Sequence, residues 1–281
     1  GLFEKIGADV IPLYCELDGT FPNHHPDPTV PKNLATLIEY VKKHNADFGI
    51  GYDGDSDRIG AVDENGRVIY GDELMVIFSR DVLKHNPGAT IISEVKSSNR
   101  LYQDITKSGG NAIMWKTGHS LIKSKMKETK ALLAGEMSGH IFFADRWFGF
   151  DDAIYSSARL YEIVANGSVT LSSLTKDLKP VISTPEIRVD CEEEKKFALI
   201  KEVTEILKSS PGKLTTIDGI RVDYEDRWGL CRASNTQPVI VLRFEALTQA
   251  LLTKIQTQFE NALSKAAEKV GHGPFNFKDA H

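Results

Sequence analysis

Short apolar segments alternate with segments of helical pattern from residue 71 to residue 178, and this alternation constrains the fold most. A strand followed by a helix and another strand is the pattern of a mostly parallel sheet covered by helices. We therefore expect an α/β domain over 71–179, whose last element is a short segment at 170–178. Its predicted strands are 89–95, 111–115 and 131–134, and its predicted helices are 72–85, 98–108, 118–128 and 151–166.

The residues before this region predict a smaller α/β domain over 1–70. Residues 2–6 have the pattern of the end of a helix, and Gly7 supplies the expected stop. The other predicted elements are a strand at Ala8–Cys15, a loop at 18–31, a helix at 32–44, a strand at 47–52 and a hairpin with the turn Asn65-Gly66.

The pattern changes after Pro180 and Pro185. A strand at 186–191 precedes an amphipathic helix, and a long final helix carries an apolar stripe from Leu251 to Val270. Between the two helices the sequence predicts strands near 214–218, 219–224, 228–231 and 238–245. We expect an α+β domain with an antiparallel sheet over 180–281. The predicted fold class is two consecutive α/β domains with mixed or mostly parallel sheets, followed by this domain.

Composition excludes several classes of function. The 281 residues are 41% hydrophobic and 26% charged, which is enough for two or three cores. A net charge of -5 argues against nucleic acid as a partner, and no apolar run has the length of a membrane helix. The chain has three cysteines, Cys15, Cys191 and Cys231. Their odd number, their wide separation and their lack of metal-ligand spacing favour a protein of the reducing cytoplasm.

Three carboxylates alternate at Asp53, Asp55 and Asp57, and Arg58 follows them. Acids this close repel one another unless a cation lies among them, and hard oxygen ligands favour Mg²⁺ or Ca²⁺. A divalent ion beside an arginine suits a phosphoryl group. An EF-hand places Glu64 at its twelfth position but requires glycine where Arg58 stands. A solvated acidic turn without metal is the other alternative.

A second polar loop, Gly135–His140, follows the predicted strand 131–134 directly. In an extended backbone Glu136 and Ser138 point the same way, as binding of a polyol requires, and His140 can exchange a proton near neutral pH. The alternative is a structural turn.

A third polar loop, Cys231–Pro238, lies between two predicted strands. It places a guanidinium, two hydroxyls and an amide within five residues, a set that suits a phosphate dianion. A plain polar hairpin is the alternative. The candidate ligands are Arg232, Ser234, Asn235 and Thr236. Lys96 and His119 lie where strands give way to helices and could face an anion, although such residues commonly serve as surface or cap contacts.

Taken together, these motifs resemble the α-D-phosphohexomutases, and within them the bacterial phosphomannomutase/phosphoglucomutase type. The resemblance covers nearly the whole chain, and five motifs occur in the order of that family. They are Asp53-Gly-Asp-Ser-Asp-Arg58, Val95-Lys96-Ser97, Lys116-Thr-Gly-His119, Gly135-Glu-Met-Ser-Gly-His140 and Arg232-Ala-Ser-Asn-Thr236.

The resemblance implies a role for each motif. The three aspartates would hold Mg²⁺ beside a phosphoserine, with Arg58 neutralising that group. Glu136 and Ser138 would bind sugar hydroxyls, and Lys96, His119 and His140 would transfer protons or stabilise charge. The 232–236 loop would anchor the phosphate that is not transferred. The implied reaction interconverts hexose 1-phosphate and 6-phosphate through a hexose 1,6-bisphosphate, with mannose or glucose phosphates as substrates.

The sequence also departs from the family. The phosphorylated serine belongs to a Thr-Ala-Ser-His-Asn-Pro type loop in the family's first domain, and these 281 residues hold no such segment. We therefore expect a truncated chain without turnover of its own, whose missing domain is absent or supplied as a separate fragment. The alternatives are a non-catalytic phosphosugar-binding module and a calcium-stabilised structural protein.

Overall fold

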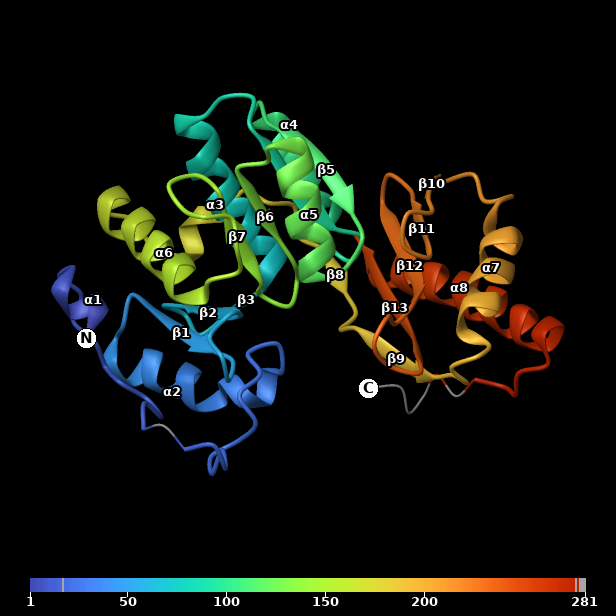
Figure 1. Ribbon diagram of the computed structural model, residues 1–281, viewed down its shortest axis with the longest axis horizontal. Coiled ribbons are helices and arrows are strands. Elements are labelled where there is room, and N and C mark those ends of the chain that lie inside the picture. The colour runs from blue at the N-terminus through green and yellow to red at the C-terminus, as the bar shows by residue number, and fades with distance from the viewer. Residues whose placement is uncertain (17, 276, 278–281) are drawn as a thin grey trace. The chain divides into compact units, whose positions relative to one another are not determined.

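The computed structural model describes residues 1–16, 18–275 and 277. The chain forms two compact units, which are described separately (Figure 1). Unit 1 comprises Gly1–Met114 and Gly118–Leu178, and unit 2 comprises Trp115–Thr117 and Lys179–His281. Each unit is built around its own hydrophobic core.

The first sheet of unit 1 is a small antiparallel meander with the order β1-β2-β3. Its strands are β1 (Phe48–Tyr52), β2 (Ile59–Asp63) and β3 (Val68–Ile69). The predicted Asn65-Gly66 turn joins β2 to β3, with Gly66 at φ +83°. Helix α2 (Ala35–His44) follows the 3-10 turn η1 (Pro31–Leu34) and packs on β1, while α1 (Leu2–Lys5) begins the chain.

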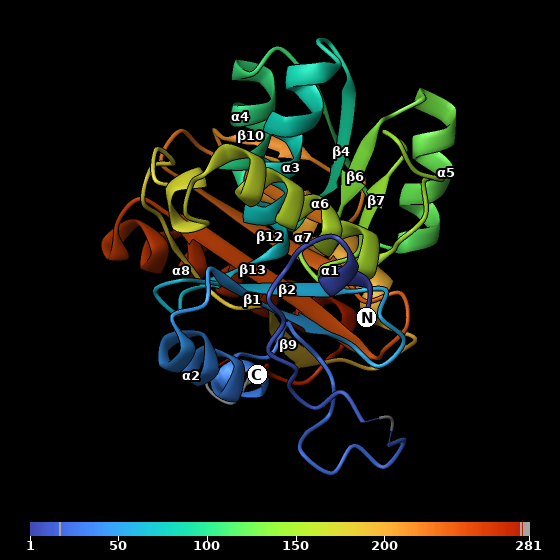
Figure 2. The ribbon, with the colours of Figure 1, turned by 90° about the vertical axis from the view of Figure 1, so that its left-hand side faces the viewer.

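The second sheet of unit 1 has the order β5-β4-β6-β7, with β4 and β6 parallel and β6 and β7 antiparallel. Helices α3 and α4 lie on one face of this sheet and α5 on the other (Figure 2). The strands are β4 (Thr90–Glu94), β5 (Asn111–Trp115), β6 (Leu133–Gly135) and β7 (Ile141–Phe143). The helices are α3 (Gly71–His85), α4 (Asn99–Lys107), α5 (His119–Thr129) and α6 (Ala153–Gly167), followed by η2 (Ser172–Leu174).

One core joins the two sheets of unit 1. Helix α3 is its centre, because Leu74, Met75 and Phe78 are fully buried between strands of both sheets. The ring of Phe78 packs edge-on against that of Phe143 with 5.1 Å between centroids. Burial of each such side chain contributes about 1.5–3 kcal/mol. This shared core fixes the loop after β1 relative to the loop after β6.

Unit 2 is an antiparallel sheet with two helices. The order is β10-β11-β12-β13-β8, and β9 also pairs with β13. Along β13, Ile240, Leu242 and Phe244 belong to the core that α7 and α8 cover. The elements are β8 (Ile182–Ser183), β9 (Ile187–Asp190), α7 (Lys196–Leu207), β10 (Lys213–Thr215), β11 (Ile220–Asp223), β12 (Arg227–Ala233), β13 (Val239–Ala246) and α8 (Gln249–Val270).

The predicted fold class is confirmed, and each predicted helix is present with small changes at its ends. The predicted strand at Ala8–Cys15 is wrong: these residues form no strand, and Val10 and Ile11 are exposed. Pro12 cannot donate to a sheet ladder, which explains part of this difference. The short strands β7 and β8 were not predicted. The domain boundaries at 70/71 and 179/180 stay a prediction.

No helix among the described residues is both long and apolar enough to cross a membrane.

Candidate functional site

The three acids of the metal loop lie together between β1 and β2. One carboxylate oxygen from each of Asp53, Asp55 and Asp57 lies within 4.8 Å of the others. Pairing of Tyr52 with Ile59 closes the loop at its base. Asp53 is buried, Asp57 is half-buried and Asp55 is exposed, so the set opens toward solvent on one side.

Hydrogen bonds hold Asp53 in its charged form. Its Oδ1 accepts the backbone N–H groups of Asp57 and Arg58 at 3.1 and 3.0 Å, and its Oδ2 accepts Nε of Arg58 at 2.6 Å. Burial alone would raise the pKa of Asp53, but the bonds from Arg58 outweigh it and lower the pKa. A lowered pKa keeps this carboxylate ionised, as a metal ligand must be.

Asp57 shows the opposite shift. Burial and the neighbouring carboxylates of Asp53 and Asp55 raise its pKa, against the attraction of His140. Like charges in one site favour uptake of a proton or of a cation. The all-oxygen donor set and this unrelieved repulsion fit Mg²⁺, which prefers carboxylate and water ligands.

The sugar loop is a tight turn between β6 and β7. Glu136 N–H donates to the carbonyl of His140 at 2.9 Å, and Gly139 N–H donates to the carbonyl of Glu136 at 3.1 Å. Glu136 is 3% exposed, and its Oε1 accepts the backbone N–H of Gly118 at 2.7 Å. Nδ1 of His140 lies 3.0 Å from Oε2 of Glu136 and 2.9 Å from the hydroxyl of Ser138. Glu136 and Ser138 therefore point toward one ring nitrogen.

Charges around His140 favour its protonated form. Burial would lower the pKa of His140, but Glu136, Asp57 and Asp151 together raise it. The pKa of Glu136 is lowered in turn, because His140 and the Gly118 N–H outweigh its burial. A half-buried imidazole between carboxylates is able to hold and release a proton near neutral pH.

The metal loop and the sugar loop are joined through their backbones. Arg58 and His140 form an antiparallel bridge, and Ile59 N–H donates to the carbonyl of Gly139 at 3.1 Å. Gly139 has φ +98°, and a Cβ there would lie 2.3 Å from the carbonyl oxygen of Ile59. This close approach places Nε2 of His140 3.3 Å from Oδ1 of Asp57.

Lys96 and His119 lie near this pair of loops. Nζ of Lys96 is 3.6 Å from Oε2 of Glu94, whose Oε1 accepts the backbone N–H of Met137 in the sugar loop. His119 begins α5, and its ring stacks on that of His140 with 5.7 Å between centroids. Unit 1 thus brings together nine predicted site residues: three metal ligands, two sugar-binding residues and four catalytic residues.

Three residues at this site were not predicted from the sequence: Asp27, Lys123 and Asp151. Nη1 of Arg58 donates to Asp27, in the predicted loop at 18–31, at 3.3 Å. Asp151 accepts Nζ of Lys123 at 2.9 Å, and its Oδ2 lies 3.3 Å from Nδ1 of His119. The pair Asp151-Asp152 was the available signal, because the N-cap of α6 uses only Asp152.

The four predicted phosphate ligands lie together in unit 2, but Arg232 is not in the loop. Strand β12 continues to Ala233, so Arg232 is a buried strand residue, and its Nε donates to Asp218 at 3.0 Å. The prediction of a loop from Cys231 is wrong at this end, because the β12–β13 ladder extends to the pair of Ala233 and Ile240.

The remaining ligands form the turn itself. The hydroxyl of Ser234 accepts the backbone N–H groups of Thr236 and Gln237 at 3.4 and 3.2 Å. Asn235 and Thr236 are exposed. Hydroxyl, amide and backbone groups at an open turn, next to a guanidinium, are suited to an anion.

Family models match this chain along most of its length. Those of the phosphoglucomutase/phosphomannomutase family match residues 1–66 as alpha/beta/alpha domain II, 70–181 as alpha/beta/alpha domain III and 186–262 as the C-terminal domain. The chain belongs to the phosphoglucomutase/phosphomannomutase family. This confirms the resemblance drawn from the five motifs.

Individual relatives agree with this assignment. A phosphomannomutase/phosphoglucomutase of Pseudomonas aeruginosa is 54% identical over 98% of this chain and 59% of its own length. A phosphoglucomutase of Neisseria meningitidis is 49% identical over 92% of this chain and 56% of its own. The crystal structure of a phosphoglucomutase/phosphomannomutase family protein from Burkholderia thailandensis matches with a TM-score of 0.89 and 46% identity, covering 98% of this chain and 58% of that one. The chain thus spans somewhat under three-fifths of these relatives.

Proposed function

We propose that this chain supplies the metal, sugar and phosphate sites of a phosphohexomutase. In this reaction a hexose 1-phosphate and a hexose 6-phosphate interconvert through a phosphoserine and a hexose 1,6-bisphosphate. The observation that carries the proposal is the backbone bridge between Arg58 and His140, which joins the acidic loop to the sugar loop. The names of the relatives support hexose phosphates as substrates.

In the proposed site, Asp53, Asp55 and Asp57 hold Mg²⁺. When bound, the ion neutralises charge that develops on the transferring phosphoryl group. Arg58 lies beside the same acids and offers its planar guanidinium to the phosphoryl oxygens.

His140 and the groups around it manage protons and orientation in the proposed reaction. Its Nδ1 is held by Glu136, and its raised pKa provides a proton for a sugar oxygen at neutral pH. Glu136 and Ser138 bind sugar hydroxyls, while Lys96 and His119 stabilise negative charge on the reacting phosphate.

The turn after β12 anchors the phosphate that is not transferred. Arg232, held by Asp218, provides paired charge-assisted hydrogen bonds, and Ser234, Asn235 and Thr236 supply neutral donors. We place the reaction in the cytoplasm and its specificity on hexoses with a free C2 hydroxyl, mannose or glucose, in keeping with the names of the relatives.

The test is calorimetric binding of glucose 1-phosphate and mannose 1-phosphate to the 281-residue chain, with and without Mg²⁺. We expect both to bind more tightly with Mg²⁺, and Asp55→Asn to remove that dependence. Lack of binding under all conditions contradicts the proposal. We further expect no turnover by these 281 residues when no phosphoserine-bearing segment is added, and measurable mutase activity would contradict that part.

A further inference from the structure

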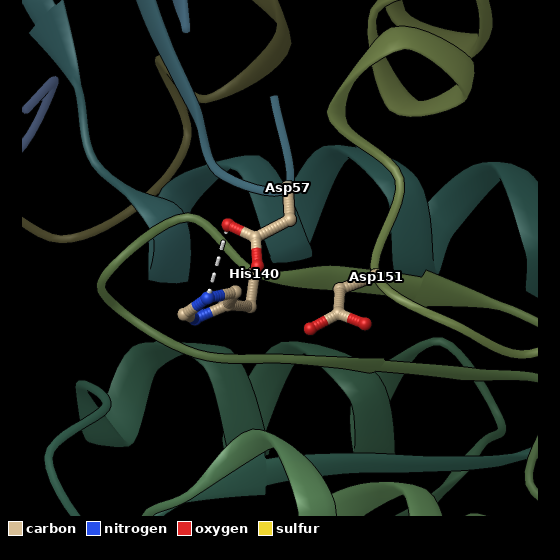
Figure 3. Close-up of side chains that lie close together, drawn as sticks. All are labelled: Asp57, His140 and Asp151. Atoms are coloured by element: carbon tan, nitrogen blue, oxygen red, sulfur yellow. Dashed lines mark ion pairs between the residues drawn. The ribbon is translucent and has the colours of Figure 1, made fainter. Parts of the chain in front are cut away.

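Asp57, His140 and Asp151 converge in unit 1, as Figure 3 shows. One ligand atom from each lies within 4.8 Å of the other two. The three come from the metal loop, the end of the sugar loop and the segment before α6. Backbone bridges pair Arg58 with His140 and Phe142 with Asp151, so the separation of these segments is set by sheet geometry.

Two of the atoms already have the spacing of metal ligands. Nε2 of His140 lies 3.3 Å from Oδ1 of Asp57. Around a tetrahedral ion with ligands at about 2.0–2.1 Å, neighbouring ligand atoms are about 3.3–3.4 Å apart. An ion can therefore bridge this pair with little movement of either side chain.

The imidazole of His140 is oriented as metal-binding histidines are. Its Nδ1 lies 3.0 Å from Oε2 of the buried Glu136, so this nitrogen carries the proton when the ring is neutral. A carboxylate on one ring nitrogen fixes the tautomer and directs the lone pair of the other nitrogen outward. In His140 that nitrogen is Nε2, on the side of Asp57, and an ion binds there in exchange for the second ring proton.

Asp151 supplies an independent observation that points to a cation. Its side chain is 9% exposed, and Nζ of Lys123 binds Oδ1 at 2.9 Å. Its Oδ2 is buried and accepts no hydrogen bond from the residues described, although Nδ1 of His119 lies 3.3 Å away. A buried carboxylate oxygen without a hydrogen-bond donor is costly, and coordination of an ion removes that cost.

We propose that Asp57, His140 and Asp151 bind a divalent transition-metal ion of the Zn²⁺ or Co²⁺ class. A mixed nitrogen and oxygen donor set favours such ions, whereas the all-oxygen set of Asp53, Asp55 and Asp57 favours Mg²⁺. Three protein ligands leave the fourth position to water or a substrate oxygen. Because Asp57 belongs to both sets, the ion and Mg²⁺ exclude each other, a consequence that rests on the proposed function.

The experiment is a Co²⁺ titration of the metal-free 281-residue chain, followed by visible absorption. Cys15 is exposed, so the titration uses a Cys15→Ser background to remove thiolate ligation. We expect the strong absorption bands of four-coordinate Co²⁺. His140→Gln should abolish them, and Asp151→Asn should weaken binding by about tenfold or more, the scale at which metal-site residues act. Asp55→Asn removes one charge from the magnesium set alone and should retain the bands.

Unfolding curves followed by circular dichroism show that each variant is folded. An unchanged Co²⁺ affinity in both Asp151→Asn and His140→Gln overturns the proposal, as do the weak bands of six-coordinate Co²⁺ in the parent chain. Excess Mg²⁺ should bleach the bands. The titration contains no sugar phosphate, so its outcome is separate from the test of the mutase proposal.

Discussion

Nε of Arg58 lies 2.6 Å from Oδ2 of Asp53, so the guanidinium binds one of the three carboxylates that could hold a metal ion in the acidic loop. The other oxygen of Asp53 accepts two backbone N–H groups. Asp53, the most buried acid of the loop, therefore accepts three hydrogen bonds within the protein. Arg58 and the metal ion compete for it, and a phosphoryl group that draws the guanidinium away would favour the metal.

We predict that Arg58→Gln binds Mg²⁺ more tightly than the parent chain. Removal of a neighbouring positive charge at a half-exposed site changes the binding free energy by about 1 kcal/mol, or roughly fivefold in Kd. Calorimetric titration with Mg²⁺ measures this. Arg67→Gln is the matched control, because Arg67 pairs with Asp63 and Glu73 outside the loop and should leave the affinity unchanged. Weaker Mg²⁺ binding in Arg58→Gln would show that the guanidinium organises the loop.

The contiguous parts of the site could be predicted from sequence. Asp53, Asp55 and Asp57 lie within five residues, as do Glu136 and His140, so local spacing alone indicated shared chemistry. Asp151 could not be found in this way. Its role depends on the pairing of Phe142 with Asp151 and on the position of α5, and both are set by the tertiary structure.

The error at Ala8–Cys15 and the error at the end of β12 have a similar cause. The apolar run within Ala8–Cys15 resembles a strand, but a strand needs a partner ladder, and these residues pair with no strand of either sheet described in unit 1. Polar residues from Arg232 onward resemble a loop, yet the long partner β13 continues the ladder to Ala233. Local composition suggests a strand, and pairing decides whether the strand forms and where it ends.

Gly139→Ala should disrupt the contact between the two loops. A Cβ at Gly139 would meet the Ile59 carbonyl oxygen at 2.3 Å with φ at +98°, so strain and a backbone clash combine. We expect a loss of about 2–5 kcal/mol in the free energy of unfolding. Gly88→Ala, with φ +81° and open space around the new Cβ, should cost only about 1–2 kcal/mol. Urea titrations compare the two, and equal losses would contradict a tight contact at Gly139.

Glu64→Gln should lower stability at neutral pH but not in acid. Burial would raise the pKa of Glu64, but the hydroxyl and backbone N–H of Ser172 outweigh it and lower the pKa below 4.5. The stabilisation is therefore present above about pH 4.5 and is lost as the pH falls through the lower folded pKa.

The expected difference in the free energy of unfolding is about 0.5–1 kcal/mol at pH 7, because water screens much of this contact. Ser172→Ala should produce a similar loss, and the double variant should lose little more than either single one. Thermal unfolding at pH 7 and pH 3 measures the effect. A difference that persists unchanged at pH 3 would assign the loss to packing.

The three cysteines should differ sharply in reactivity. Burial raises the pKa of Cys191 to about 11, and complete burial also raises the pKa of Cys231, whereas Cys15 is exposed. At pH 8 a thiol with a pKa of 11 is thiolate in roughly one molecule in 1,000. A chromogenic disulfide reagent should modify one thiol rapidly in the native chain and three in guanidinium chloride. Rapid modification of two native thiols would contradict the burial of Cys191.

Arg232→Ala should weaken binding of hexose phosphates without loss of the fold. The guanidinium is buried, and Asp218 holds it through Nε. A hydrogen bond to a charged group contributes about 1.5–3 kcal/mol, which corresponds to a rise of roughly 10- to 150-fold in Kd.

Arg227→Ala is the matched control, because Arg227 lies on the same strand and pairs with Asp226. Calorimetry with glucose 1-phosphate in the presence of Mg²⁺ compares the variants after unfolding curves show that each is folded. If both arginine variants bind like the parent, the phosphate anchor lies elsewhere. If both lose affinity equally, the effect is general charge and not a built site at the turn after β12.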